Sequence, residues 1–334
     1  MKRGLRATKM CKRRAILFNF EEEFSTVFSS EIISILLKDK TTKKNIIWAT
    51  DIYRKYNETY SAEKEIKINF IFGKRGAIIK PRNEKSKEEQ LKRVRNNAEV
   101  FTPSWICNRQ NNVIDENWFG RKEVFNSEKE KSWETRSENI HFSDEKGRSW
   151  KDYIRAKRLE ISCGEAPYIT SRYDAVSGEY IAVKNRVGLL DRKLRVVSEN
   201  AENIKDWLFW AKKAVQSVYG YDWQGDNVLI ARKNVLFTVA EHYEDKFGES
   251  LEAEDLADFA KVISWNIWQM DGLKFVVPNS CCTKEIVEQD LFESRVVAKP
   301  CEGCLKGDNK KHNGIYCCIM DWEKHKKVRF VDLF

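Results

Sequence analysis

Short apolar runs alternate with longer amphipathic segments in the middle of this chain. Three apolar runs predict short strands, at residues 159–162, 219–223 and 266–270. Three segments with helical spacing of apolar positions predict helices, at residues 201–218, 225–247 and 251–264. Strands that alternate with helices favour a parallel sheet with helices on both faces. We therefore expect an α/β, Rossmann-like sheet that binds its ligand at the carboxyl ends of the strands.

The flanking segments have different patterns. Residues 1–46 have an apolar stripe at helical spacing, while the alternation over 64–72 predicts a strand. Residues 83–100 are acidic early and basic late, which is typical of a helix that complements its own dipole. Residues 108–150 are polar with scattered aromatic rings, and we expect irregular surface there. The predicted units are a basic N-terminal region, the sheet domain and a cysteine-rich insertion with a final strand, at residues 1–98, 99–275 and 276–334.

The excess of basic over acidic side chains is confined to the first hundred residues of the chain. The 334 residues carry 60 Lys and Arg against 51 Asp and Glu, a net charge of +9. Residues 1–100 hold 24 basic and 13 acidic side chains, whereas the remainder holds 36 and 38. This excess predicts either a DNA partner or a solvated charged face. The candidate phosphate contacts are Lys74, Arg75, Lys80, Arg82, Lys92, Arg93 and Arg95.

The N-terminal sequence and the cysteines indicate in which cellular compartment the protein is expected. The apolar run after the basic opening is short and is followed by three glutamates, so a signal peptide is not expected. No apolar run reaches membrane-spanning length, which predicts no membrane association and a cytoplasmic protein. Nine cysteines in a reducing compartment favour metal binding over disulfides.

Four short segments carry the candidate ligand chemistry. LEISCGEAPY places an acid in a strand and a glycine at the turn after it, where peptide N–H groups can approach a ligand. VYGYDWQGDN and NIWQMDGLK each end a strand with an aspartate, and AEVFTPSWICN forms a rigid turn before a helix. Taken singly, such residues are more typical of ordinary helix caps. The candidate residues are Phe101, Thr102, Pro103, Glu160, Cys163, Gly164, Glu165, Asp222 and Asp271.

The order of these segments resembles the γ-type adenine-N6 DNA methyltransferases of restriction-modification systems. EVFTP, EISCGEA, YGYDWQGDNVLIARKNVL and QMDGLK follow one another as that family's motifs do, over about residues 85–275. The resemblance implies S-adenosylmethionine as cofactor, with Thr102 and the Gly164 turn at its methionine end, Asp222 at the ribose and Asp271 at the adenine amine. The corner departs from the family at Ile161, where proline is usual, and at Ala166-Pro167, which replaces a second glycine.

The family's catalytic element is missing from this stretch. Its members carry an Asp/Asn/Ser-Pro-Pro-aromatic sequence, whereas the five prolines here include no adjacent pair. The resemblance therefore implies the cofactor-binding part of an enzyme whose catalytic and target-recognition parts are missing or lie on a partner chain, such as a second methyltransferase chain or a restriction subunit. The alternative is a non-catalytic DNA- or protein-binding module with a degenerate methyltransferase fold. We expect no catalytic residue within this chain.

A cysteine cluster near the C-terminus predicts a zinc site. CEGC has the form of a zinc knuckle, because a tight turn brings two thiolates together. Paired cysteines and a histidine before and after it can complete a tetrahedron, and a site with four protein ligands is structural. We expect Cys281, Cys301, Cys304 and Cys317 as ligands, with Cys282, Cys318 or His312 as substitutes.

Overall fold

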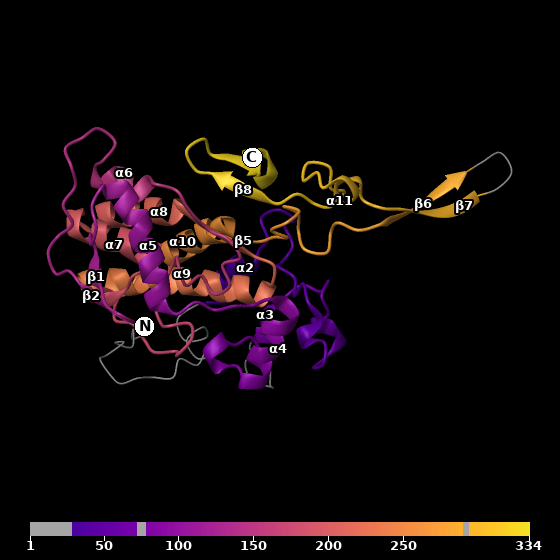
Figure 1. Ribbon diagram of the computed structural model, residues 1–334, viewed down its shortest axis with the longest axis horizontal. Coiled ribbons are helices and arrows are strands. Elements are labelled where there is room, and N and C mark those ends of the chain that lie inside the picture. Colours follow the sequence, from indigo (N-terminus) through magenta and orange to yellow (C-terminus); the bar gives the residue numbers. More distant parts are fainter. Residues whose placement is uncertain (1–28, 72–77, 290–293) are drawn as a thin grey trace, which may run out of the picture.

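The structure is a computed structural model that describes residues 29–71, 78–289 and 294–334 (Figure 1). The apolar stripe predicted for residues 1–46 lies partly outside these ranges, as do Lys74 and Arg75 of the predicted phosphate surface. Nothing in the structure tests the predicted boundaries near residues 98 and 275, which stay a prediction.

A three-stranded parallel sheet lies at the centre of a mixed α/β fold. Its strands are β3 (Arg158–Glu160), β4 (Val218–Asp222) and β5 (Ile267–Gln269), in the order β3-β4-β5. In this register Glu160 pairs with Gly220, and Asp222 pairs with Gln269. The carboxyl ends of all three strands therefore meet at one edge of the sheet.

Helices cover one face of this sheet. Alternation along β4 separates Val218, in the large core, from Tyr219 and Tyr221, which pack in a second cluster with Phe330. The large core is formed with the helices, whereas the second cluster includes residues of β8 and of the C-terminal turn η5. The expectation of helices on both faces is therefore corrected: a hairpin covers the second face. The elements are α7 (Leu189–Asn200), α8 (Ile204–Gln216), α9 (Gly225–Phe247), α10 (Ala253–Asn266), β8 (Cys318–Asp321), β9 (Lys326–Arg329) and η5 (Phe330–Leu333).

The long helix α9 ties the sheet to the N-terminal region. Its Arg232 is fully buried and donates hydrogen bonds to the carbonyl oxygens of Ile267 (2.7 Å) and Ser264 (3.2 Å). The same guanidinium also donates to the carbonyl of Leu36, at the end of α2 (Ser30–Leu37). Because Leu36 lies in the large core, the N-terminal helix packs as part of the sheet domain's interior.

Two predicted segments differ from the structure. Residues 64–72, expected as a strand, contain the single helical turn α3 (Ile68–Ile71). The polar stretch expected as irregular surface begins with α5 (Ser104–Phe119), a helix of 16 residues. The remaining elements of this half are η1 (Asp51–Tyr53), η2 (Glu58–Tyr60), η3 (Arg82–Glu84), α4 (Lys87–Asn97), β1 (Asn126–Glu128), β2 (Trp133–Thr135), α6 (Trp150–Arg155) and η4 (Val183–Asn185).

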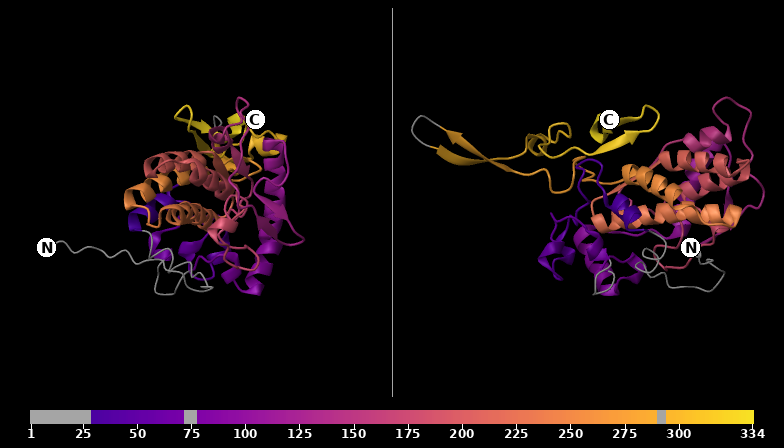
Figure 2. Two further views of the ribbon diagram at one scale, coloured as in Figure 1. Left: turned by 90° about the vertical axis from the view of Figure 1, so that its left-hand side faces the viewer. Right: turned by 180° about the vertical axis from the view of Figure 1, so that it is seen from behind.

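The segment before the C-terminal hairpin forms a two-stranded ribbon that extends from the body of the molecule. It consists of β6 (Lys284–Gln289) and β7 (Ser294–Lys299), paired antiparallel. The short helix α11 (Glu302–Lys306) follows at its base. Figures 1 and 2 show the ribbon projecting along the long axis of the molecule, away from the helices.

Candidate functional site

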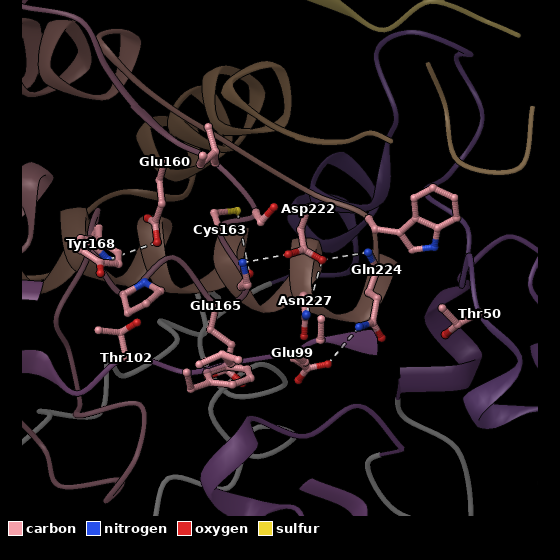
Figure 3. Close-up of a pocket in the computed structure, with 18 of the residues that line it drawn as sticks. Thr50, Glu99, Thr102, Glu160, Cys163, Glu165, Tyr168, Asp222, Gln224 and Asn227 are labelled. Carbon is pink, nitrogen blue, oxygen red and sulfur yellow. Dashed lines mark hydrogen bonds between the residues drawn. The ribbon is translucent and has the colours of Figure 1, made fainter. Parts of the chain in front are cut away.

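A cavity of about 530 Å³ opens at the carboxyl ends of β3 and β4 (Figure 3). Its wall is built from the corner after β3, the end of β4 with the start of α9, and the segment that leads into α5. The lining residues are Thr50, Asn96, Ala98, Glu99, Val100, Phe101, Thr102, Glu160, Ile161, Ser162, Cys163, Gly164, Glu165, Pro167, Tyr168, Asp222, Trp223, Gln224 and Asn227. Seven of the nine sequence-predicted cofactor residues therefore line a single cavity.

The corner after β3 turns through left-handed backbone. Ser162, Gly164 and Ala166 have φ angles of 48°, 53° and 64°. Such angles disfavour side chains with a Cβ atom, so the corner is strained at Ser162 and Ala166 and relaxed at Gly164. The Cys163 N–H still donates to the Tyr221 carbonyl at 2.8 Å, which holds the corner against β4.

Asp222 joins this corner to the end of β4. Its carboxylate accepts hydrogen bonds from the N–H of Gly164 (2.9 Å), the N–H of Gln224 (2.8 Å) and the side-chain amide of Asn227 (3.4 Å). Burial raises the pKa of Asp222 to about 6, and the two backbone N–H donors oppose that rise. The structure thus brings together the glycine and the aspartate that the sequence set 58 residues apart.

Glu160 binds the backbone that follows the corner. Its carboxyl oxygens accept from the N–H groups of Tyr168 (3.3 Å) and Ile169 (3.1 Å). Burial raises its pKa to about 8. The visible role of Glu160 is to shape the turn through these two hydrogen bonds.

Two further carboxyl groups complete the wall. Glu165 accepts from the N–H of Arg82 (2.6 Å) and from the hydroxyl of Tyr173 (2.7 Å), and burial raises its pKa. Glu99 accepts from the side chains of Arg93 (2.8 Å) and Gln224 (2.9 Å). The lining contains four acids and neither lysine nor arginine. Glu99 is already paired with Arg93, whereas no ion pair among the described residues involves Glu160, Glu165 or Asp222, and such a wall opposes a ligand that carries phosphates.

The segment before α5 supplies an aromatic ring and a hydroxyl. Phe101 and Thr102 line the cavity, and the Arg82 guanidinium lies 4.6 Å from the centroid of the Phe101 ring. Pro103 is the N-cap residue of α5 and is not among the residues that line the cavity.

Asp271, expected at the adenine amine, is not among the residues that line this cavity. Its carboxylate accepts from the N–H groups of Leu273 (2.9 Å) and Lys274 (3.1 Å) and so closes its own turn. Beside it, the Gln269 side chain pairs with both backbone groups of Ile47 and with the Trp223 carbonyl. The end of β5 is therefore occupied by an N-terminal segment.

Several lining residues escaped the sequence reading. Trp223 and Gln224 directly follow Asp222, and Asn227 lies in the first turn of α9, so the nearness of a strand-end acid to the next helix was the signal that could have found them. Thr50 comes from a segment more than a hundred residues earlier and has no local pattern that marks it. Only the fold brings Thr50 to this cavity.

A second site lies at the base of the ribbon. Ligand atoms of Cys281, Cys301, Cys304 and His312 all lie within 4.8 Å of one another. The Cys281 and Cys304 sulfurs are 3.6 Å apart, and His312 Nδ1 lies 3.5 to 3.7 Å from the three sulfurs. A tetrahedral zinc ion with ordinary bond lengths requires about 3.8 Å between sulfurs and about 3.6 Å between sulfur and nitrogen. This cluster could hold a metal ion such as zinc.

The choice of Cys317 as a ligand is corrected to His312. Cys317 is buried in the second core cluster, and its thiol donates to the Gln269 carbonyl at 3.3 Å. Its thiol therefore faces the sheet, and His312, named before as a substitute, completes the cluster. Cys282 and Cys318 also lie outside the group of possible ligands found in the described residues.

Arg93, one of the predicted phosphate contacts, is buried. Arg93 is 2% exposed and is bonded to Glu99, to the Tyr53 hydroxyl and to Asp226. Such an arginine is part of the interior and is inaccessible to DNA. Lys80, Lys92 and Arg95 are exposed, and Lys92 pairs with Glu88 on α4.

No helix in the described ranges combines the length and the apolar character that a bilayer crossing needs. Comparisons of the chain with protein-family models, with curated proteins and with solved structures find no match.

Proposed function

We propose that the chain binds S-adenosylmethionine in the cavity at the carboxyl ends of β3 and β4, and that it is the cofactor-binding part of an adenine-N6 DNA methyltransferase. One observation carries the proposal. A glycine corner and a strand-end aspartate meet by a 2.9 Å hydrogen bond in the wall of a cavity that has four acids and no basic side chain. The cavity volume of about 530 Å³ is typical of a small-molecule site.

Charge distinguishes this cofactor from other nucleotides. S-adenosylmethionine carries a sulfonium, an ammonium and a carboxylate group, so its net charge is positive, and it has no phosphate. Dinucleotides and ATP carry phosphates, which require basic side chains or converging N–H groups. The carboxyl groups of Glu165 and Asp222 suit the first ligand and oppose the second.

The resemblance assigns parts of the cofactor to parts of the wall. The methionine end would lie between Thr102 and the Gly164 turn, and the ribose would lie beside Asp222. Asp271 is unavailable for the adenine, so the Trp223 ring and the Thr50 hydroxyl, which line the cavity, take that role in our proposal.

The proposed chemistry needs little from this chain beyond positioning. In methyl transfer the adenine N6 nitrogen bonds to the methyl carbon, the carbon–sulfur bond breaks, the sulfonium becomes a thioether and N6 loses a proton. A bound cofactor already carries the activating charge, so the protein contributes orientation and exclusion of water. The groups that accept the N6 proton and stack on the base would come from the missing proline-pair element.

Titration calorimetry tests the cofactor. We expect heat on titration with S-adenosylmethionine, and weaker binding of S-adenosylhomocysteine, which lacks the sulfonium charge. ATP should not bind, because its phosphates would face the carboxyl groups of the wall. A chain that binds ATP more tightly than S-adenosylmethionine, or that gives no heat with S-adenosylmethionine, would contradict the proposal.

A specific observation supports a second candidate, a non-catalytic module with a degenerate pocket. Both oxygens of Asp222 already accept N–H groups, which leaves less acceptor capacity for a ribose. Under this candidate, calorimetry shows no cofactor binding while DNA or protein binding persists. Under the first candidate, adding a chain that carries the proline-pair element restores methyl transfer to DNA.

The two remaining elements of the proposal are the metal and the DNA partner. Three thiolates and one imidazole at tetrahedral spacing favour Zn²⁺ over harder cations, and four protein ligands give it a structural role. DNA binding would use the exposed Lys80, Lys92 and Arg95, which contact phosphates without reading sequence.

A further inference from the structure

The β6–β7 ribbon exposes an apolar cross-strand pair. Val287 and Val296 lie directly opposite each other, and their side chains are 67% and 65% exposed. Figures 1 and 2 show that the ribbon extends beyond the body, so the helices do not cover it. An isolated two-stranded hairpin is at best marginally stable in water.

The root of the ribbon carries a further destabilising feature. Lys284 and Lys299 pair directly across the two strands, which places two like charges on neighbouring side chains. Like charges opposite each other in an antiparallel pair oppose pairing. The lysine pair therefore weakens strand pairing at this end of the ribbon.

The metal cluster lies at that end. Cys281 comes just before β6 begins, and Cys301 comes just after β7 ends. Cys304 lies one helical turn beyond Cys301 on α11, and its sulfur is 3.6 Å from the Cys281 sulfur. The cluster thus contains one ligand from each foot of the ribbon.

Contacts around the ligands pre-form the cluster. The Asn313 N–H donates to the Cys301 sulfur at 3.3 Å, a contact that stabilises a thiolate. The second ring nitrogen of His312 lies 3.4 Å from the Asn309 side-chain oxygen, which favours the tautomer that leaves Nδ1 free to bind a metal. A Cβ atom on Gly303 would lie 2.6 Å from the backbone nitrogen of His312, so the close approach of α11 to this loop requires glycine.

We propose that a Zn²⁺ ion at this cluster clamps the two feet of the β6–β7 ribbon and makes the ribbon's folding dependent on the metal. The inference rests on the zinc assignment of the proposed function and adds what the ion does. Zinc bonded to Cys281 and Cys301 fixes the distance between the two strand ends and offsets the repulsion of the lysine pair. The free energy of metal binding then becomes folding free energy of the ribbon.

Hydrogen exchange combined with metal analysis tests this clamp on the full chain. Protein purified without chelator should contain about one zinc per chain. Treatment with a chelator should speed amide exchange in residues 284–289 and 294–299 by about tenfold or more, while exchange in α9 stays unchanged. Zn²⁺ should restore the slow exchange, and Mg²⁺ should not, because it prefers oxygen ligands.

Two matched variants separate ligand loss from a general effect of substitution. Cys304→Ser removes a ligand whose side chain is exposed, so the core remains intact, and it should lower zinc content and speed exchange in the ribbon. Cys282→Ser changes an exposed cysteine beside the cluster that is outside the ligand group, and it should behave as the wild type.

The outcomes distinguish the clamp from the metal itself. Absence of zinc in every preparation would overturn both. Stoichiometric zinc with ribbon exchange that ignores the chelator would overturn the clamp and leave the zinc assignment standing. Loss of zinc from Cys282→Ser alone would overturn the ligand set. None of these results depends on whether S-adenosylmethionine binds.

Discussion

Replacing Asp222 by asparagine tests the cavity at its central side chain. The two carboxylate oxygens of Asp222 accept the N–H of Gly164 and the N–H of Gln224, one on each oxygen. Asparagine keeps one oxygen and places an NH₂ group where the other stood. One of these two N–H groups then faces a donor, and the negative charge beside the proposed ribose is lost.

The expected loss of affinity follows from the hydrogen bond between the proposed ribose hydroxyl and the ionised Asp222 carboxylate. A hydrogen bond to an ionised group contributes about 1.5–3 kcal/mol, so its loss should weaken S-adenosylmethionine binding about 10- to 150-fold. The same change also removes a pH dependence. With a pKa of about 6 for Asp222, the ionised fraction is about 0.9 at pH 7 and about 0.1 at pH 5. Wild-type affinity should therefore fall about tenfold over that interval, and the variant's affinity should change less.

Calorimetry at pH 5 and pH 7 measures both effects. Thermal unfolding of each variant checks that Asp222→Asn still folds, and Asp144→Asn, at an exposed aspartate outside the cavity, is the matched control. Equal wild-type affinity at the two pH values would refute the role given to an ionised Asp222. Unchanged affinity in a folded Asp222→Asn would refute its contact with the cofactor.

Three further changes probe stability and DNA binding. Glu241 is buried against Arg172, and its pKa is lowered from 4.5 to about 2, so its stabilisation is present above about pH 4.5 and is lost as the pH falls toward 2. Glu241→Gln should lower the free energy of unfolding by about 3 kcal/mol at pH 7 in urea titrations, and should flatten the acid dependence. Gly225→Ala places a Cβ 2.0 Å from the Ile47 carbonyl oxygen and should destabilise by about 3 kcal/mol or more, whereas an unchanged midpoint would contradict that contact. Lys80→Glu should weaken DNA binding and reduce the slope of log affinity against log salt by about 0.9 or more in anisotropy titrations, and an unchanged slope would remove Lys80 from the DNA surface.

The central sheet and α9 could be predicted because their patterns are local. The helix expected at residues 225–247 has those bounds in the structure, and strands lie within one or two residues of the three apolar runs. Each strand is short, β4 and β5 are buried throughout, and each strand is followed by turn residues, so no distant contact was needed to recognise it. The covering of the second sheet face depended on where the C-terminal hairpin folds back, which no local pattern records.

A helix after Pro103 was expected, but its extent to Phe119 was missed because many of the buried residues of α5 are polar. Asn111 is fully buried and donates to the carbonyl oxygens of Tyr168 and Val187. Asp115 is buried against Arg192 in the same way. The partners lie 57 to 77 residues away, so the sequence around α5 looks like exposed surface although the helix is half interior.

The metal ligands show the same division between local and distant information. Cys301 and Cys304 could be predicted from their spacing, because one helical turn brings both sulfurs to one side. The third and fourth ligands depend on the direction of each side chain after the chain turns back. Cys317 enters the second core cluster, so its thiol faces the sheet and His312 takes the place beside α11.

The buried acids of this fold form two groups, which differ in their partners and in the direction of their pKa shifts. Away from its wall, Asp226 and Glu241 pair with arginines, and the pKa of each falls to about 2. In the wall, burial raises the pKa of Glu160 to about 8 and that of Asp222 to about 6, and it raises the pKa of Glu165 as well. Of the acids in the wall, Glu99 is paired with Arg93, whereas these three have backbone N–H and hydroxyl partners in a cavity at the carboxyl ends of β3 and β4. Uncompensated acids that cluster at a cavity are typical of a binding site, and the charge that would compensate them is positive.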